Sequence, residues 1–520
     1  MVGKGQDEVE KVWLNGGEQM RQANRKGIFV LPVVFVLAAV MMIWALTRPD
    51  PARGEPKDSP APEDNALTFP LIVSGEAPAN LSAMQEQFNE YVEEKIGVSV
   101  RFVPVDVGTL KDFYLLQKSS SDNTDFICLM PAGTQLSEMV EAGLVLPLDG
   151  LLEEYGEGIL HAAAEVLPTG QLRGVQYMIP EVKDVYTMGT SIEFNAALVN
   201  KYGFDITNVK TLTDIEPMLA VIAAQEPGVV PLTASVGITG YTQLLGGYDS
   251  LNNNLGVLDL MEDRSLTVVD WYETERFMAL AQQMRDWYLK GYIAQDTVVA
   301  QISGYELISS GRAFCSINTI MPTGDQGTDL NNSTGVIEIQ LTEQPQLLTS
   351  YYAGLEGVCI STSCQEPEKA MQLLELLYTD PYLVNLLEYG VEGEDYTVTP
   401  EGMADNGGSY FLMFGQPLNQ TLRYVPVEAG AAYSAQCAAF SARNVVSPAF
   451  GFVFDSSPVA REVALCQAVV DEYFPVIDCG CVDPETEIPK FIAALKEAGI
   501  DTIVAEKQRQ LDEWANFNLR

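Results

Sequence analysis

Side chains that could carry out catalysis are scarce in this sequence. His161 is the only histidine, and it lies in an alanine-rich stretch, GILHAAAEV, where a packing or surface role is expected. Any Ser-His-Asp or Cys-His arrangement would have to use it. The chain has no G-x-S-x-G elbow, no P-loop and no H-E-x-x-H motif. Its 71 Asp and Glu residues could supply the paired carboxylates of a glycoside hydrolase, but no pair stands out.

The eight cysteines do not form a metal-binding or disulfide pattern. Cys479 and Cys481 are close in sequence, as are Cys359 and Cys364, while the others are scattered. Structural zinc needs two well-spaced pairs or additional histidines. Disulfides could form in an exported chain, but no framework spacing is visible. We therefore predict buried, unpaired thiols, with no metal and no cofactor.

Aromatic side chains near predicted loops indicate binding rather than catalysis. A sugar presents flat apolar faces and a rim of hydroxyl groups, so its binding sites combine aromatic platforms with Asn, Asp or Glu acceptors. Burial in a core is the alternative for each ring, and Trp271-Tyr272 could equally form a hydrophobic staple ahead of a helix. The aromatic candidates are Tyr177, Tyr241, Tyr248, Trp271, Tyr351 and Tyr352.

Composition restricts the partners and the number of lobes. The formal net charge of −41 repels phosphate backbones, so nucleic-acid binding is not expected. Hydrophobic residues make up 47% of the chain and aromatic residues 9%, which indicates an ordered body rather than an acidic disordered one. The body from Leu67 to Arg520 is too long for one hydrophobic core, which predicts two or more lobes.

The first part of the body alternates between strand and helix patterns. Leu67–Val73 is a short apolar run, Val98–Val105 alternates as a strand, and Asp125–Met130 is a buried-strand candidate, with helical spacing of apolar residues in between. This order predicts a parallel α/β layer. Ligands bind beyond the carboxyl ends of such strands, so Ser74–Glu76 and Met130–Gly133 should face a cleft.

A second unit begins after Tyr177–Pro180 and is also a mixture of helices and strands. Ser309–Met321 indicates a helix end, a glycine turn and a buried strand. The tail from Pro458 is expected to be helical, with Pro489 opening the segment Phe491–Ala498. Further helical patterns run through Ala196–Lys201, Leu212–Ala224 and Glu273–Lys290, and another follows Pro367 with the apolar face Ala370, Met371, Leu373, Leu374 and Leu377.

The N-terminal region predicts a membrane anchor. Gly27–Leu46 is a run of 20 residues without a charge, long enough to cross a bilayer as a helix. More Lys and Arg residues precede the run than follow it, which favours a cytoplasmic segment 1–26 and an extracellular body. Proline-rich residues 47–66 suit a semi-rigid tether. A cleaved signal peptide is the alternative, but the run is longer than usual and its exit, WALTRPD, lacks an A-x-A site.

Several stretches carry a family likeness. They are GVSVRFVPV, LVLPLDGLLEEYG, GVQYMIP, NKYGFDITNVKTLTDIEPML, YETERFMALAQQMRDWYLKGYIAQD and GVCISTSCQEPEKAMQLLELLYTDPYLVNLLEYGVEG. In these the chain resembles the extracellular solute-binding proteins of ABC importers, in the sugar-binding branch. The tail from FGFVFDSSPVAREVALC onward is similar to the C-terminal domain of a subgroup from Gram-positive bacteria. That subgroup usually bears a lipobox cysteine, where this chain has the long apolar run.

The resemblance implies a type II periplasmic-binding-protein fold, α/β in class, with a hinge and a helical C-terminal region after the transmembrane helix. Lobe one would comprise residues 67–182 and 350–400, lobe two residues 186–345, and residues 401–520 would pack on the lobes. By analogy, Tyr177, Asn318 and Tyr351-Tyr352 lie near the hinge side of the cleft. Glu76 and Tyr241 would face each other from the two rims.

The function that follows is solute capture without catalysis. The chain is expected to hold a small solute, a carbohydrate, between its lobes and to deliver it to an ABC importer permease. One alternative is a surface sensor or scaffold that contacts a partner through its cytoplasmic segment. A glycoside-processing enzyme is a further alternative, which the absence of catalytic motifs disfavours.

Overall fold

The computed structural model describes residues 66–117, 123–130, 134–234, 244–261, 264–294, 304–322, 335–407, 416 and 418–518. The predicted cytoplasmic segment and the predicted span at 27–46 lie outside these residues, as does the tether apart from Ala66. Within the described ranges, no helix has both the length and the apolar character needed to cross a membrane.

Five strands form the sheet of lobe one, and the first three of them along the chain are those predicted for the first part of the body. They are β1 (Leu67–Val73), β2 (Val100–Asp106), β3 (Phe126–Leu129), β6 (Ile179–Pro180) and β15 (Gly357–Ile360). β1 and β2 pair in parallel along their whole lengths, and β15 is antiparallel to β3 and β6. The Asp125 amide donates to the Thr68 carbonyl at 2.9 Å and so joins the two groups of strands. The carboxyl ends of β1, β3 and β6 therefore lie along one edge, as α/β order requires.

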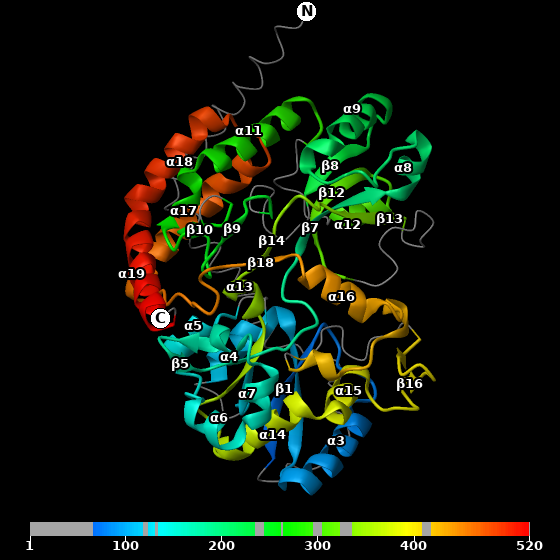
Figure 1. Cartoon of the computed structure of the whole chain (residues 1–520), viewed down its shortest axis with the longest axis vertical. Helices are drawn as coiled ribbons and strands as arrows, with labels where there is room; N and C mark the ends of the chain where they lie inside the picture. Colours follow the sequence, from blue (N-terminus) through cyan, green and yellow to red (C-terminus); the bar gives the residue numbers. More distant parts are fainter. Residues whose placement is uncertain are drawn as a thin grey trace, which may run out of the picture. The chain divides into compact units, whose positions relative to one another are not determined.

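Helices cover this sheet and fix its hydrophobic core (Figure 1). They are α3 (Leu81–Ile96), α4 (Leu110–Gln117), α5 (Leu136–Glu141), α6 (Asp149–Tyr155), α7 (Glu157–Ala162), α14 (Pro367–Thr379) and α15 (Pro381–Tyr389). In α3, Met84, Phe88 and Val92 recur every fourth residue and are fully buried. The five apolar residues predicted for the helix after Pro367 are all buried in α14.

Lobe two has a four-stranded mixed sheet in the order β13-β7-β12-β8. Its strands are β7 (Gly189–Asn195), β8 (Val230–Ala234), β12 (Ala313–Ile320) and β13 (Val336–Gln340), with helices α8 (Ala196–Tyr202), α9 (Glu216–Gln225), α11 (Glu275–Leu289) and α12 (Gly304–Ser309). Ile192 and Phe194 of β7 enter the core, while Ser191 and Glu193 point to the opposite face. Gly311 turns the chain between α12 and β12 at φ +74°, a left-handed conformation that glycine adopts without steric cost.

The C-terminal helices build a further core with the middle of the chain (Figure 1, orange and red). They are α17 (Ala460–Asp478), α18 (Pro484–Ala498) and α19 (Ile500–Asn518), and they pack against β9 (Tyr248–Asp249), β10 (Val257–Asp259), β11 (Val268–Val269) and α11. Trp271 and Tyr272 are buried here, Tyr272 against Phe491 at 4.7 Å between ring centroids. Trp271, an aromatic candidate for ligand binding, is therefore a buried residue of this core.

One helix boundary was predicted wrongly. α18 begins at Pro484, five residues before the expected start, and contains Pro489. The Asp483 side chain accepts a hydrogen bond from the Glu485 amide and caps the helix. Pro484 suits the first turn because it has no amide hydrogen to leave unpaired. Pro489 is tolerated inside, at the cost of the hydrogen bond to the Glu485 carbonyl.

Chain segments that cross between the lobes lie side by side. β14 (Gln346–Leu348) pairs in parallel with β18 (Asn444–Val446), and residues 181–188 link β6 to β7. The buried Gln346 amide lies within hydrogen-bond distance of Thr187 Oγ1 (3.1 Å), the Phe440 carbonyl (3.0 Å) and Asn444 Oδ1 (2.7 Å). Its side chain thus contacts segments from all these crossings, which is the arrangement of a hinge.

A buried lysine ties α19 to the loop before β10, and its removal should destabilise the protein. Lys507 is fully buried, which lowers the pKa of its amino group well below the usual range. Its Nζ donates to the carbonyls of Asn253 and Gly256, at 3.1 and 2.7 Å, and to Asn253 Oδ1 at 2.7 Å. Lys507→Met leaves these oxygens without a donor, so we expect a loss of about 3 kcal/mol in the free energy of unfolding, measured in urea. The control Lys490→Met removes an exposed pair with Glu487 and should cost less than about 1 kcal/mol. Equal losses in the two variants would contradict this role.

Candidate functional site

A cavity of about 320 Å³ lies where the crossing segments meet the strand ends of both lobes. β6 ends at Pro180 and β12 at Ile320, and the residues that follow each strand contribute to its wall. The rest comes from Tyr352 of α13 (Ser350–Ala353), from Tyr433 of α16 (Tyr433–Ser441), and from the segments that contain Leu355, Glu356, Gln420 and Arg423. The lining residues are Lys183, Asp184, Val185, Tyr186, Thr187, Met188, Met321, Pro322, Tyr352, Leu355, Glu356, Gln420, Arg423 and Tyr433. We refer to this space as the hinge cavity.

One wall of the hinge cavity is a compact group of charged side chains. Lys183 forms an ion pair with Glu356, and its ammonium lies 3.3 Å from a carboxyl oxygen of Glu181. Burial raises the pKa of Glu181 well above its usual range, so this carboxyl holds its proton and donates it to Glu356. Burial opposes ionisation of Glu356, but the hydrogen bond from Glu181 and the charge of Lys183 lower its pKa. The group is therefore one ammonium, one carboxylate and one neutral acid.

A second ionic group joins the C-terminal region to the first crossing segment. The Arg423 guanidinium donates to Glu388 at 3.0 Å and to Asp184 at 3.2 Å, and Tyr433 donates its hydroxyl to the same Asp184 oxygen at 3.2 Å. Burial opposes the charge of Arg423, but Glu388 and Asp184 raise its pKa. A backbone hydrogen bond adds to this connection, in which the Gln420 amide donates to the Val182 carbonyl at 2.8 Å. These contacts hold residues 418–433 against the cavity.

The lining chemistry suits a neutral polar solute. Two positive and two negative side chains face the cavity, Lys183 and Arg423 against Asp184 and Glu356, so their charges balance. Three tyrosine rings and the Gln420 amide provide flat apolar faces and hydrogen-bonding groups. In the described part of the chain, no group of three or more His, Cys, Asp or Glu side chains has the geometry to hold a metal ion. The volume lies in the range of small-molecule sites.

Of the predicted site residues, Tyr352 lines the hinge cavity. Burial raises the pKa of its hydroxyl to about 12, and its ring contacts Tyr351 at 5.4 Å between centroids. Tyr351 lines a separate, smaller cavity, together with Leu129 at the end of β3 and Asn252. Leu355 lines both spaces. The structure thus brings Tyr351 and Tyr352 together at the second crossing.

The other predicted residues lie apart from the hinge cavity. Glu76 is exposed in the loop after β1, and Tyr177 is half-buried beside a separate cavity with Glu141 and Arg173. Tyr241 lies outside the described residues. So do residues 131–133 of the segment Met130–Gly133, which was predicted to face the cleft. No observation tests ligand contact by any of them, so their role in binding stays a prediction.

Asn318 belongs to a buried polar face of the lobe two sheet. It lies on β12 opposite Ser191 and forms a hydrogen bond with the Glu193 carboxylate. Glu338 on β13 lies opposite Glu193 and accepts a hydrogen bond from Ser191 Oγ at 2.6 Å. Burial raises the pKa of Glu338 to about 7, and the neighbouring Glu193 adds to the shift. Asn318 therefore serves here as a partner for a buried carboxyl group.

Sequence reasoning missed the charged residues of the hinge cavity. Lys183 and Asp184 lie three and four residues after the motif GVQYMIP, which ends at the carboxyl end of a strand, and this position was the available signal. Arg423 and Tyr433 lie in a region without a recognisable pattern. Their contact with Asp184 spans more than 230 residues of chain, so no local signal could reveal it.

The raised pKa of Glu338 predicts how stability depends on pH. Glu338 keeps its proton in the folded protein up to about pH 7, whereas an unfolded glutamate loses it near pH 4.3. The contribution of Glu338 to the free energy of unfolding is therefore full at low pH and is lost as the pH rises through 7. Glu338→Gln should be more stable than the wild type by about 2 kcal/mol at pH 8, with the advantage disappearing toward pH 4. Denaturation at a series of pH values measures this difference.

The control for this comparison is Glu343→Gln, which changes an exposed carboxyl group nearby in sequence. Its stability relative to the wild type should stay constant over the same pH range. A Glu338→Gln variant that is less stable than the wild type at pH 8 would mean that the pKa of Glu338 is not raised in the folded protein.

Comparisons with known proteins identify relatives over most of the chain. A carbohydrate ABC transporter substrate-binding protein of Streptococcus pneumoniae serotype 4 (strain ATCC BAA-334 / TIGR4) is 25% identical over 460 residues, covering 85% of this chain and 89% of the relative. The crystal structure of the N-glycan transport solute-binding protein NgtS from Streptococcus pneumoniae matches with a TM-score of 0.74 and 24% identity, over 87% of this chain and all of that one.

A more distant structure has the same fold. The substrate-binding protein FusA of a Streptococcus pneumoniae ABC transporter, in complex with kestose, matches with a TM-score of 0.61 and 13% identity, over 87% of this chain and all of that one. Residues 448–516 match a domain of unknown function, DUF3502, which agrees with the separate C-terminal domain expected from the tail. The two-lobed solute-binding fold is thereby confirmed. The model of the bacterial extracellular solute-binding proteins matches residues 75–383, more than half of the 520 residues, and the chain belongs to that family.

Proposed function

We propose that the protein captures a carbohydrate between its two lobes and presents it to an ABC importer permease. The observation that carries this proposal is the hinge cavity, where the strand ends of both lobes meet the crossing segments. The names of the relatives support the choice of solute. NgtS has been crystallised with Man1GlcNAc and with Man5GlcNAc, and FusA with kestose.

The chemistry of the hinge cavity supports an uncharged solute. Each charged side chain on its wall already has an opposite partner, so a charged solute would give up its hydration without gaining a free counter-charge. Sugar hydroxyls can donate to the carboxylates and accept from Lys183, Arg423 and the Gln420 amide, while a ring face lies on tyrosine.

Lobe closure would provide the signal to the permease. A solute that contacts both lobes binds the closed form more tightly than the open form and so shifts the population toward closure. We take residues 67–182 and 350–400 as lobe one and residues 186–345 as lobe two, with residues 401–520 as the C-terminal region that packs on them. Closure then needs rotation only within the crossing segments, which Gln346 holds together.

The test of solute capture is thermal unfolding of the full-length chain with mono- and oligosaccharides, peptides and polyamines. A solute at 100 times its dissociation constant should add about 2.7 kcal/mol of stability, which is a shift of several degrees. Tyr352→Ala should weaken the same solute about tenfold, because it removes a platform of the hinge cavity. Tyr305→Ala, on the 44% exposed Tyr305 of α12, is the matched control and should bind as the wild type does.

The outcomes of this test are distinct. A shift with peptides or polyamines alone would contradict the choice of carbohydrate, and no shift with any solute would contradict capture. Equal weakening by Tyr352→Ala and Tyr305→Ala would place the solute elsewhere.

We also propose that the apolar run at 27–46 remains in the mature protein as a single-pass anchor, with the body extracellular. The length of the run and its exit sequence support this. After expression in a bacterial host, the chain should stay in the membrane fraction at alkaline pH and in high salt. The mass of the purified protein should include residues 1–26. Release into the medium as a shortened chain would favour a cleaved signal peptide instead.

A further inference from the structure

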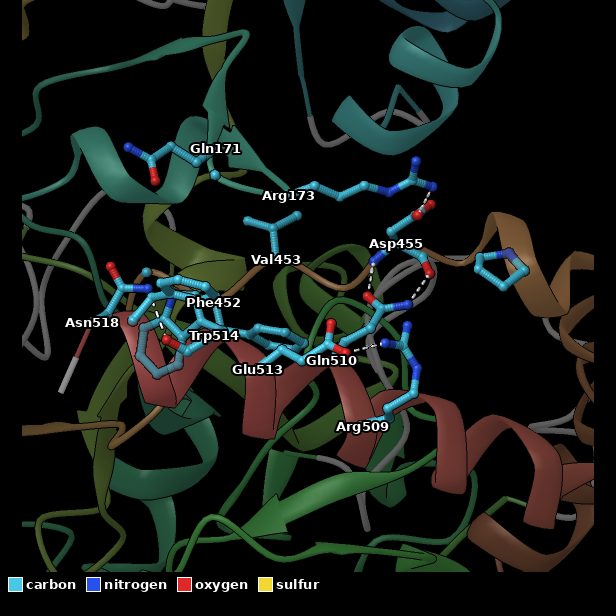
Figure 2. Close-up of a pocket in the computed structure, with 14 residues that line it drawn as sticks. Gln171, Arg173, Phe452, Val453, Asp455, Arg509, Gln510, Glu513, Trp514 and Asn518 are labelled. Carbon is cyan, nitrogen blue, oxygen red and sulfur yellow. Dashed lines mark hydrogen bonds and ion pairs between the residues drawn. The ribbon is translucent and has the colours of Figure 1, made fainter. Parts of the chain in front are cut away.

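A cavity of about 720 Å³ lies between the hairpin of β4 (Gln171–Leu172) and β5 (Val175–Gln176) and the last turns of α19 (Figure 2). On its wall, the buried Asp455 carboxylate forms an ion pair with Arg173 of the hairpin. The Gln510 side chain of α19 accepts from the Asp455 amide at 3.0 Å and donates to its carbonyl at 2.8 Å, as Figure 2 shows. These contacts hold the C-terminal region on lobe one, and the reactive groups of this region lie elsewhere.

The turn that ends α17 brings the sulfur atoms of two cysteines together. The Cys481 amide donates to the Val476 carbonyl and the Gly480 amide to the Ile477 carbonyl, each at 3.0 Å. This pair of bonds is the Schellman motif, in which a glycine takes the left-handed conformation just past the helix, here at φ +72°. Cys479 and Cys481 flank this glycine, and their sulfur atoms are 3.0 Å apart.

Contacts with α11 fix this turn in place. The Arg285 guanidinium donates through Nη1 to the carbonyls of Gly480 and Cys481, at 3.0 and 3.1 Å. A Cβ atom at Gly480 would collide with the Met284 carbonyl oxygen, so the turn lies directly on the backbone of α11. The two sulfur atoms are therefore held close to each other before any reaction takes place.

The two thiols differ in exposure and in acidity. All eight cysteines lie in the described part of the chain, and each is buried except Cys481, which is half-buried. Hydrogen bonds with Cys479 and Tyr288 and the charge of Arg285 lower the pKa of Cys481 to about 7, although burial opposes this. The same hydrogen bond, together with burial, raises the pKa of Cys479 well above the usual range. Because the thiolate is the reactive form, Cys481 is the nucleophile of the pair.

We propose that Cys479 and Cys481 are a redox-active pair, which closes to a disulfide in the extracellular protein and exchanges with low-molecular-weight thiols and disulfides. This site is separate from the hinge cavity and does not depend on which solute is captured. A disulfide bond is about 2.05 Å long, so the sulfur atoms need to approach each other by only about 1 Å. The chain belongs to an extracellular family, and disulfides form in oxidising extracellular environments.

The exchange uses a disulfide RS–SR, such as oxidised glutathione, as its oxidant. The Cys481 thiolate attacks one sulfur of RS–SR, which breaks the S–S bond, releases RS⁻ and leaves Cys481 bonded to SR. The released thiolate takes the proton of Cys479. The Cys479 sulfur then attacks Cys481 Sγ and expels the second RS⁻, which takes up the proton that Cys481 lost to solvent. Two protein thiols are thereby oxidised to one disulfide, and RS–SR is reduced to two RSH.

The experiment equilibrates the full-length chain, in detergent, with buffers of reduced and oxidised glutathione. Acid stops the exchange, and N-ethylmaleimide then labels every free thiol under denaturing conditions before the peptides are weighed by mass spectrometry. In oxidised buffer, the peptide that contains Cys479 and Cys481 should stay unlabelled and be lighter than the dithiol by two hydrogen atoms. In reduced buffer both should be labelled. The peptide with Cys359 and Cys364, the other pair close in sequence, is the internal control and should be labelled in both buffers.

Two matched variants separate the roles of the sulfur atoms. Cys479→Ala leaves the nucleophile without a second thiol, so a mixed disulfide of Cys481 with glutathione should accumulate. Cys481→Ala leaves only the buried Cys479, which should take up no glutathione. In the reduced wild type, the rate of alkylation of Cys481 by iodoacetamide should rise with a midpoint near pH 7. Cys479→Ala removes the hydrogen bond that lowers this pKa, so the midpoint should move up by about one unit.

The wild-type measurement decides the matter even if a variant fails to fold. Labelling of both cysteines in oxidised buffer would overturn the inference. A disulfide from Cys481 to another cysteine, or to a second copy of the chain, would also overturn it. Equal uptake of glutathione by the two variants, once both are shown to be folded by circular dichroism, would contradict the assignment of Cys481 as the nucleophile.

Discussion

The position of the Gln346 side chain is the constraint on which the two-lobed arrangement depends. A buried amide must find partners for its hydrogens and its oxygen, since each group left unpaired costs about 1–3 kcal/mol. Gln346 finds them on Thr187, Asn444 and the Phe440 carbonyl, and its oxygen accepts from Gln340 at 3.0 Å. Of these partners, Thr187 and Asn444 belong to different crossing segments. The hydrogen bonds of this one side chain therefore hold together the segments about which the lobes can move.

The C-terminal region completes both the hinge and the cavities. Its first part, residues 418–433, is held on lobe one through the Val182 backbone and the Arg423 ion pairs. After β18 the chain crosses and builds a core with Trp271 and Phe277 of the middle region. One segment of chain thus contacts both the hinge cavity and the core around Trp271. Its removal would leave Asp184 without Arg423 and the β10 loop without Lys507, so it is part of the fold rather than an appendage.

Local signals predicted the elements, and long-range contacts decided the site. The apolar face of α14 follows from helical spacing alone, because each residue contributes independently to burial. Pro489 was misread because a proline favours a helix start, while the Asp483 cap had already provided one. Tyr352 was identified by likeness to a family, and it lines the hinge cavity. The ion pair of Lys183 with Glu356 joins residues far apart in sequence, and neither residue type is unusual among 71 acidic and 30 basic side chains.

The acidity of the whole chain and the neutrality of the hinge cavity are consistent with each other. A formal charge of −41 creates a field that raises the local concentration of cations and repels anions. A binding site with unpaired carboxylates would therefore fill with metal ions or polyamines. Pairing each wall carboxylate with Lys183 or Arg423, and keeping Glu181 protonated by burial, removes that competition. Under the proposed function, recognition is then left to shape, ring faces and neutral hydrogen bonds, the interactions by which a protein distinguishes one uncharged sugar from another.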